Sequence, residues 1–413
     1  MPSFPAGLSF APDSTSATHS ASAVRSTPAV RSKPAAVRST PAGVRPPPAL
    51  RPPPALRSTL ATRIDLDHLG PRTVPIDFEA VGPDHAPTVV LGGISAGRHL
   101  APTSAHPEPG WWRGVVEQGG ALDPARRLLI GMDFLGGPCE DEVLRPVTTH
   151  DQARALAAML DHLGIAATSL VGASYGGMVA LAFAELFPAR VSKLVILGAA
   201  HRTHPMATAV RTVQRAAATL GAETGHSARG LALARALAMT TYRSIDEFEA
   251  RFSSFALTPG SPATPGTLAT SGTPATPVTP GTPVTPGTPG TPGHTPSRFP
   301  VEEYLDSRGA AFAEIFTTDR FLALSESIDL HGTRPGSLPP DAHLVSFDTD
   351  VIVPPWLVDE LARRQEPSPV RQEPSPVRHV TIPSLFGHDA FLKETGEVAR
   401  QITLGLAEEE ALR

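Results

Sequence analysis

The sequence predicts an α/β protein with a mostly parallel central sheet and an inserted helical segment. Two observations support this class. Strand-like apolar runs alternate with helix-like segments up to about residue 200, and the alternation returns after residue 336. Between these parts, residues 201–335 carry helical patterns with no strand pattern among them. Alternating strands and helices are typical of a parallel sheet covered on both faces.

The chain divides into parts that follow these patterns. Residues 58–200 are expected to form the first part of the core, and residues 336–413 the second part. The expected strands are 74–81, 87–91, 127–134, a strand ending at Gly172, 193–198, 342–347 and 378–382. The expected core helices are 149–163 and the one that ends near Phe187. Residues 201–335 are expected to form a helical lid, with helices at 206–220, 229–241, 245–255 and 301–328.

Three stretches of low complexity interrupt this pattern. Residues 1–57 repeat Arg- and Pro-rich units, residues 258–297 consist largely of Thr-Pro-Gly units, and residues 365–378 duplicate Gln-Glu-Pro-Ser-Pro-Val-Arg. Such segments lack the apolar side chains that a core needs, so we expect a disordered N-terminal segment and two surface loops. Long surface insertions are tolerated because the entropy of loop closure grows only logarithmically with length.

Composition excludes several classes of partner. The 35 basic and 40 acidic residues leave a formal charge of −5, which predicts neither nucleic-acid binding nor a polybasic membrane contact. The single cysteine, Cys139, allows no internal disulfide and fits a reducing compartment. No apolar run approaches the roughly 20 residues of a membrane span. We therefore expect a cytoplasmic protein that acts on small molecules.

The most informative motif is Gly-Ala-Ser-Tyr-Gly-Gly at residues 172–177. It follows the apolar run 169–171 and precedes the helix-like run 178–184, the context of a nucleophile elbow. Small residues let the chain turn sharply from strand to helix and present Ser174 at a helix N-terminus. The motif therefore predicts acyl chemistry with Ser174 as the nucleophile.

A serine nucleophile needs a histidine base, and the histidine needs a carboxylate that fixes its tautomer. Asp350 follows a predicted strand and precedes a proline-bounded turn, and Asp348 is the reserve candidate for the acid. His388 follows the last strand, after Gly387, and is the candidate base. Together they complete the chain order Ser, Asp, His.

The oxyanion of an acyl-transfer intermediate needs two backbone N–H donors. One is expected from Tyr175, directly after the nucleophile. The other is expected from the glycine-rich loop at residues 91–97, where Ile94 is the candidate donor.

At these residues the chain resembles the homoserine O-acyltransferases of methionine biosynthesis, which have the α/β-hydrolase fold. The resemblance implies an acyl-enzyme at Ser174, formed from an acyl-coenzyme A co-substrate, and a ping-pong transfer to homoserine without a metal or bound cofactor. It also implies a possible homodimer through the lid helices. The matching stretches are residues 110–112, 133–137, 172–178, 230–235, 241–244 and 387–392.

An amino-acid acceptor carries a carboxylate and an ammonium group, so its pocket needs a cation and an anion. Arg243 suits the carboxylate through its bidentate fork, and Asp389, next to the base, suits the ammonium. Arg235 is the alternative clamp for the carboxylate.

Several alternatives stay open from the sequence. The run Gly-Gly-Ile-Ser-Ala at 92–96 differs from the His-Ala-Leu-Thr-Gly of many relatives and is shared with members that resemble succinyl transferases. The acyl donor is therefore succinyl- or acetyl-coenzyme A, and the smaller residues favour succinyl-coenzyme A. The acceptor could be serine, because one methylene gives a pocket only about 1–3 kcal/mol of discrimination. Hydrolysis by an esterase or thioesterase uses the same triad, and the proline-rich segments also fit a non-catalytic interaction protein.

Overall fold

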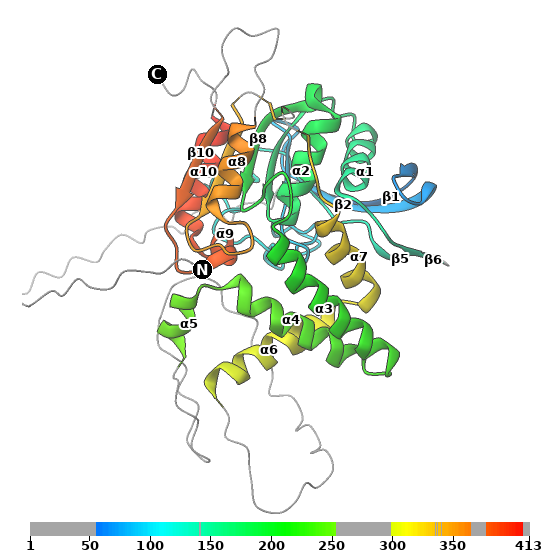
Figure 1. Cartoon of the computed structure of the whole chain (residues 1–413). Coiled ribbons are helices and arrows are strands. Elements are labelled where there is room, and N and C mark those ends of the chain that lie inside the picture. The colour runs from blue at the N-terminus through cyan, green and yellow to red at the C-terminus, as the bar shows by residue number, and fades with distance from the viewer. Residues whose placement is uncertain are drawn as a thin grey trace, which may run out of the picture. The chain divides into compact units, whose positions relative to one another are not determined.

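The computed structural model describes residues 55–139, 142–252, 299–334, 336, 338–339, 341–364 and 377–407. These residues form an eight-stranded sheet with helices on both faces (Figure 1), which confirms the predicted fold class. The insert at 258–297, nearly all of the N-terminal segment 1–57, and residues 365–376 of the duplicated stretch lie outside the described residues.

The sheet has the strand order β1-β2-β4-β3-β7-β8-β9-β10. The pairs β1·β2 and β2·β4 are antiparallel, and every pair from β4 to β10 is parallel. The strands are β1 Ala55–Leu66, β2 Gly70–Val81, β3 Thr88–Leu91, β4 Leu129–Met132, β7 Thr168–Ala173, β8 Val191–Leu197, β9 His343–Phe347 and β10 Arg378–Ile382. A separate pair, β5 Gly137–Cys139 and β6 Glu142–Leu144, is antiparallel.

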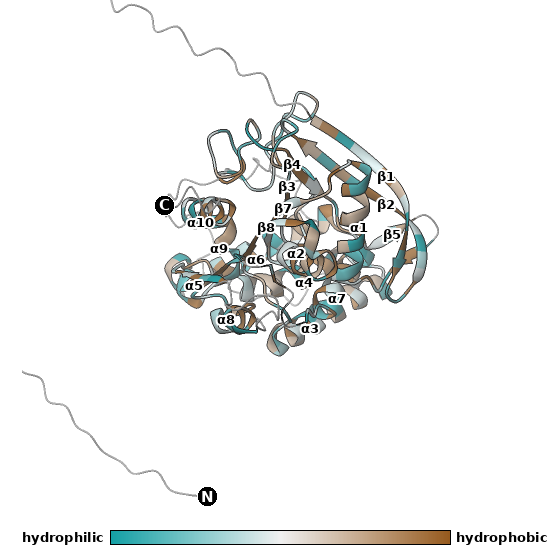
Figure 2. Cartoon of the chain, turned by 90° about the horizontal axis from the view of Figure 1, so that it is seen from above, coloured by the Kyte–Doolittle hydropathy of each residue, from teal (hydrophilic) through white to brown (hydrophobic). Residues whose placement is uncertain are grey.

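Two apolar cores lie on opposite faces of the sheet because side chains alternate along each strand. In β8, Leu194 and Ile196 belong to one core, whereas Val195 and Leu197 belong to the other. Helices α1 Thr149–His162, α2 Tyr175–Leu186 and α8 Pro355–Arg363 contribute to the first core. Helices α9 Ala390–Lys393 and α10 Thr395–Leu406 contribute to the second, and Figure 2 shows α10 across the sheet from α1 and α2.

The helices of the predicted lid lie beyond one end of the sheet layers (Figure 1). They are α3 Pro205–Glu223, α4 Ser227–Tyr242, α5 Ile245–Arg251, α6 Pro300–Ile315 and α7 Thr318–Asp329. The helix expected at 301–328 is two helices, because the chain is extended at Phe316 and Thr317. The Thr317 hydroxyl then caps the new helix by accepting from the Arg320 amide at 3.3 Å.

Strand β1 was not predicted from the sequence. It begins at Ala55, so three residues of the segment expected at 1–57 belong to the sheet. Its side chains are mostly exposed, and only Ile64 and Leu66 are buried. An edge strand of this kind has a weak apolar signal, and here it directly follows the proline-rich repeats.

Candidate active site

Ser174 lies at the tight turn between β7 and α2, with φ 54° and ψ −122°. This positive φ is unusual for a residue with a side chain and is typical of a nucleophile elbow. The turn depends on neighbouring glycines. A Cβ on Gly172 would lie 2.5 Å from the Gly176 carbonyl oxygen, and one on Gly176 would lie 2.4 Å from the Leu91 carbonyl.

The structure brings the predicted serine, histidine and aspartate together. Ser174 Oγ lies 2.7 Å from His388 Nε2, and His388 Nδ1 lies 2.7 Å from Asp350 Oδ2. His388 and Asp350 are buried. Since Asp350 accepts at Nδ1, the proton of a neutral imidazole resides there, and Nε2 is left free to accept the Ser174 proton.

Asp350, rather than the reserve candidate Asp348, contacts the histidine. The second carboxylate oxygen of Asp350 accepts from the amides of Ile352 and Val353, at 2.8 and 2.9 Å. The Asp348 carboxylate instead accepts from the Ser384 amide at 2.8 Å. Asp348 therefore anchors the loop that carries His388.

His388 is held in place by the turn that precedes it. The Thr349 hydroxyl donates to the Ser384 carbonyl at 2.6 Å and accepts from the Gly387 amide at 3.1 Å. Gly387 has φ 56°, and a Cβ there would lie 2.8 Å from the Tyr242 carbonyl oxygen. The glycine therefore allows the histidine turn to pack directly against the end of α4.

Two opposing effects set the basicity of His388. Burial lowers the pKa of the imidazole, because a buried cation loses hydration. The charge of Asp350 and its hydrogen bond act in the opposite direction and outweigh burial, so the pKa of His388 is raised above its ordinary value. The pair is thus built to stabilise an imidazolium, which a general base becomes during reaction.

The predicted oxyanion donors lie on two segments that are tied together. Tyr175 is the first residue of α2, so its amide has no acceptor within the helix. Among the described residues the Ile94 amide donates no hydrogen bond to the backbone. The Gly176 amide donates to the Gly92 carbonyl at 2.8 Å and fixes the elbow against the loop that carries Ile94.

The predicted acceptor residues Arg243 and Asp389 contact each other. Arg243 Nε lies 3.1 Å from Asp389 Oδ2, and Arg243 Nη1 donates to both Glu247 carboxylate oxygens at 3.0 and 3.1 Å. All three side chains are largely buried. Two carboxylates therefore already neutralise the Arg243 guanidinium, which the sequence interpretation expected to be available to a substrate.

The alternative clamp, Arg235, has a different environment. Its guanidinium lies 5.3 Å from the centre of the Tyr242 ring and 5.4 Å from that of Phe312, and among the described residues it forms no ion pair. The Tyr242 ring lies 5.7 Å from the His388 ring. Sequence reasoning assigned no role to Tyr242. The aromatic side chain of this residue, within the matching stretch 241–244, was the signal that could have identified it.

Comparisons with known proteins agree with this fold. A family model described as the alpha/beta hydrolase fold matches residues 89–227. The homoserine O-succinyltransferase of Xanthomonas campestris pv. campestris is 37% identical over 349 residues, covering 84% of this chain and 83% of the relative. The homoserine O-acetyltransferase of Thermus thermophilus is 32% identical and covers 73% of each chain. The crystal structure of homoserine O-acetyltransferase from Bacillus anthracis superposes with a TM-score of 0.69 at 15% identity, over 87% of this chain and 99% of that one.

The fold and the serine at its elbow define the protein as a member of the α/β-hydrolase class. The sequence identity and coverage of the relatives define the family within this class. This chain belongs to the family of homoserine O-acyltransferases, which confirms the family resemblance drawn from its motifs. No helix among its described residues is long and apolar enough to cross a membrane.

Proposed function

We propose that this protein is a homoserine O-acyltransferase of methionine biosynthesis, which transfers a succinyl or acetyl group from an acyl-coenzyme A to L-homoserine. The observation that carries this proposal is the hydrogen-bonded chain from Ser174 through His388 to Asp350, in a family whose relatives carry these names. The acyl-coenzyme A is a co-substrate, and the mechanism uses no bound cofactor. A cytoplasmic location is part of the proposal, since a single cysteine fits a reducing compartment.

The first half-reaction forms an acyl-enzyme. Ser174 Oγ attacks the thioester carbonyl while His388 Nε2 takes its proton, and Asp350 stabilises the resulting imidazolium. The amides of Ile94 and Tyr175 donate to the oxyanion of the tetrahedral intermediate. When the carbon–sulfur bond breaks, His388 returns the proton to the sulfur, and coenzyme A leaves as the thiol.

The second half-reaction uses the same groups. His388 removes the proton of the homoserine hydroxyl, whose oxygen attacks the acyl carbonyl. Collapse of the second intermediate breaks the bond to Ser174 Oγ, which regains a proton from His388. The product is the O-acyl ester of homoserine, and the enzyme returns to its starting state.

We assign the acceptor carboxylate to Arg235 and the acceptor ammonium to Asp389. Arg235 carries a charge that no described carboxylate neutralises, and it lies on the Tyr242 ring next to His388. Asp389 adjoins the base in sequence, and Arg243 contacts its carboxylate at 3.1 Å. Arg243 is therefore a positioning residue that orients Asp389, with Glu247 balancing its charge.

The decisive experiment measures coenzyme A release from acetyl- and succinyl-coenzyme A, with and without homoserine. We expect release that depends on homoserine, and a Ser174→Ala variant with kcat lowered by about 10⁴-fold or more. Serine as the acceptor in parallel assays tests the related activity. Release that is equally fast without any acceptor would identify a thioesterase and refute the transferase.

The acceptor assignment predicts different outcomes for two arginines. Arg235→Met should raise the KM for homoserine roughly tenfold to a hundredfold, because a charge-assisted pair worth about 1.5–3 kcal/mol is lost. Arg243→Met should instead lower the thermal midpoint, because it leaves the buried Asp389 without its ion-pair partner and leaves Glu247 with Arg251 alone. Arg229→Met, at an exposed position of the same helix as Arg235, serves as the matched control. Equal KM values for the Arg235 and Arg229 variants would contradict the assignment.

A homodimer through the lid is also part of the proposal. Met206, Val213 and Leu220 recur every seven residues on one face of α3 and are 64%, 58% and 61% exposed. An apolar stripe of this kind favours contact with another apolar surface. Light scattering of the intact chain and of Val213→Glu measures whether this stripe holds two copies together.

A further inference from the structure

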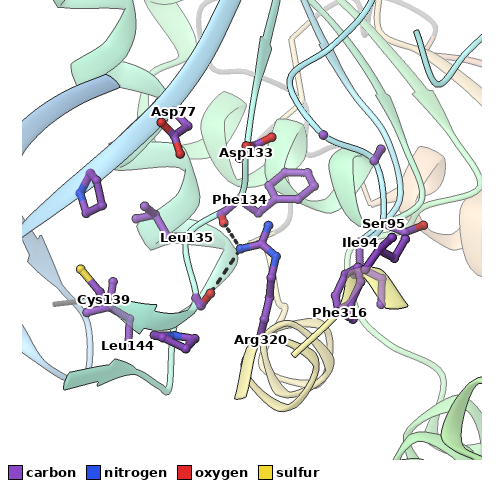
Figure 3. A pocket seen from close by; sticks show the side chains of 16 residues that line it. Asp77, Ile94, Ser95, Asp133, Phe134, Leu135, Cys139, Leu144, Phe316 and Arg320 are labelled. Atoms are coloured by element: carbon purple, nitrogen blue, oxygen red, sulfur yellow. Dashed lines mark hydrogen bonds between the residues drawn. The ribbon is translucent and has the colours of Figure 1, made fainter. Parts of the chain in front are cut away.

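A cavity of about 370 Å³ lies beside the loop that carries the proposed oxyanion donor Ile94 (Figure 3). One wall is this loop, a second is the segment after β4, and a third is the start of α7. Figure 3 shows the Arg320 side chain extending from α7 between Phe134 and Ile94. The proposed function assigns no role to this cavity or to this arginine.

Among the described residues, Arg320 donates its hydrogen bonds to neutral groups. Its Nη1 donates to the carbonyls of Phe134 and Gly136, at 2.9 and 3.3 Å (Figure 3). No carboxylate among the described residues lies within ion-pair distance of it. Two aspartates also line the cavity, and both form ion pairs with Arg98. The Nη1 atom of Arg98 lies 2.8 Å from Asp77 and 3.4 Å from Asp133.

The placement of Arg320 is unfavourable without an anion. It lies in the first turn of α7, where the positive end of the helix dipole repels a cation. Burial lowers the pKa of its guanidinium and outweighs the opposing effect of the nearby Asp133 and Asp77 charges, although an arginine stays charged at neutral pH. Residues that break such local rules are expected at functional sites.

The backbone opposite Arg320 is shaped to admit it. Gly136 and Gly137 both have positive φ values, 128° and 95°. A Cβ on Gly137 would lie 2.9 Å from the Arg320 Cα. These glycines therefore let the segment after β4 pack on α7 and offer its carbonyls to the guanidinium.

The cavity adjoins one of the two proposed oxyanion donors and lies near the side chain of the residue that supplies the other. Ile94 lines it directly. Phe134 also lines it, and the Phe134 ring lies 4.7 Å from that of Tyr175, the second donor. An acyl carbonyl held by the Ile94 amide therefore has the cavity beside it, and Arg320 lines that cavity without a carboxylate at ion-pair distance.

We propose that Arg320 binds the terminal carboxylate of a dicarboxylic acyl group, so that the donor is succinyl-coenzyme A. A planar guanidinium pairs with a carboxylate through two parallel hydrogen bonds, and Arg320 keeps N–H groups beyond those used by the two carbonyls. An acetyl group has no terminal carboxylate that could pair with Arg320. This inference rests on the proposed function, because it names the donor for the same nucleophile.

The test compares three donors on the full chain with homoserine as acceptor: succinyl-, acetyl- and succinamoyl-coenzyme A, the last carrying a neutral amide in place of the carboxylate. The wild type should prefer succinyl-coenzyme A. Arg320→Met should lower kcat/KM for succinyl-coenzyme A by about a hundredfold, equivalent to about 2.8 kcal/mol, and leave acetyl-coenzyme A nearly unchanged. It should also remove the preference for the carboxylate over the amide.

Two controls separate binding from structure. Arg145→Met removes a cation that contacts α7 at Glu326 from outside the cavity, with 2.6 Å between Nε and the carboxylate, and it should leave donor preference unchanged. Arg320→Lys retains the charge and should recover part of the succinyl activity. Equal losses with succinyl- and acetyl-coenzyme A in the Arg320→Met variant would show a merely structural role and overturn the inference.

Intact mass after incubation with each donor, without homoserine, separates this inference from the proposed function. A succinyl-enzyme that depends on Arg320 but that homoserine does not resolve would support the inference and refute the acceptor. A protein acylated only by acetyl-coenzyme A would overturn the inference and leave the transferase intact. A protein acylated by neither donor would overturn both.

Discussion

At the scale of single residues, the candidate site depends on how His388 is surrounded. Its Nε2 contacts Ser174 and its Nδ1 contacts Asp350, each at 2.7 Å. The contact with Asp350 is buried and the contact with Ser174 is partly buried, so water does not compete strongly for these hydrogen bonds. The protonation state of this one imidazole should therefore control the first half-reaction.

The pH dependence of kcat/KM should report this imidazole. The base must be neutral to accept the Ser174 proton, and the raised pKa of His388 places the loss of activity on acidification above about pH 6.5, the ordinary value for histidine. Asp350→Asn should remove the interactions that raise the pKa, so the acidic limb should move to lower pH. The same variant should lower kcat by about 10⁴-fold, because it no longer fixes the tautomer.

Asp348→Asn is the matched control for this experiment. Asp348 lies two residues from Asp350 but accepts from the Ser384 amide, so its variant should keep the wild-type limb. The measurement is kcat/KM for acyl-coenzyme A between about pH 5 and 9. An acidic limb that stays in place in Asp350→Asn would rule out His388 as the titrating base.

Sequence reasoning identified three residues that the structure brings into contact, but it did not identify the ion pairs of the predicted acceptor residues. Ser174, Asp350 and His388 follow strand ends, and the carboxyl ends of parallel strands meet at one edge of a sheet. The two ion-pair partners of Arg243 lie at very different distances from it along the chain. Glu247 follows Arg243 by only four residues, so this pair is local in sequence, whereas the contact with Asp389 joins distant segments and needs the folded structure.

At the scale of elements, the elbow depends on close contact between α2 and the neighbouring strand. Gly176 lies in the first turn of α2 and faces the end of β3, where its amide reaches Gly92. This contact fixes the angle at which the helix leaves the strand, and hence the direction of Ser174. Side chains at this position would separate the two elements.

Gly176→Ala should therefore destabilise the fold. Its Cβ would lie 2.4 Å from the Leu91 carbonyl, and overpacking against backbone costs about 3 kcal/mol. Gly396→Ala is the matched control, because a Cβ added there would have no described atom within 4 Å beyond its own helix, and it should stabilise by about 0.5 kcal/mol. Urea unfolding of both variants measures the difference. Equal stability of the two variants would contradict the close contact at the elbow.

The elements that sequence reasoning missed have common physical causes. The core strands were found because their apolar runs are buried on both faces, as in β7. Strand β1 was missed because one face of it is exposed, and its signal alternates with arginine and threonine. The break between α6 and α7 was missed because the apolar pattern continues through Phe316, while the capping role of Thr317 becomes visible only in the backbone.

At the scale of the whole molecule, the described residues on either side of the long insert lie close together in the predicted lid. Residues 253–298 lie between the ends of α5 and α6, outside the described residues. The Phe252 ring lies 5.2 Å from that of Tyr304 and 5.4 Å from that of Phe248. The Arg251 guanidinium lies 4.7 Å from the centre of the Tyr304 ring. This aromatic cluster joins the two helices without the insert.

Deleting residues 262–293 should therefore preserve both the lid and the activity. The deletion shortens the connection by roughly two halvings, and each halving should stabilise the fold by about 0.6 kcal/mol through the smaller entropy of loop closure. We expect homoserine-dependent kcat/KM to stay within about twofold of the parent value, because surface loops tolerate such changes. Tyr304→Ala in the intact chain is the contrasting variant, since it removes the cluster and should lower the thermal midpoint and raise KM. If the deletion variant has the parent's thermal midpoint or a higher one but has lost the transfer reaction, the insert itself takes part in the function of the lid.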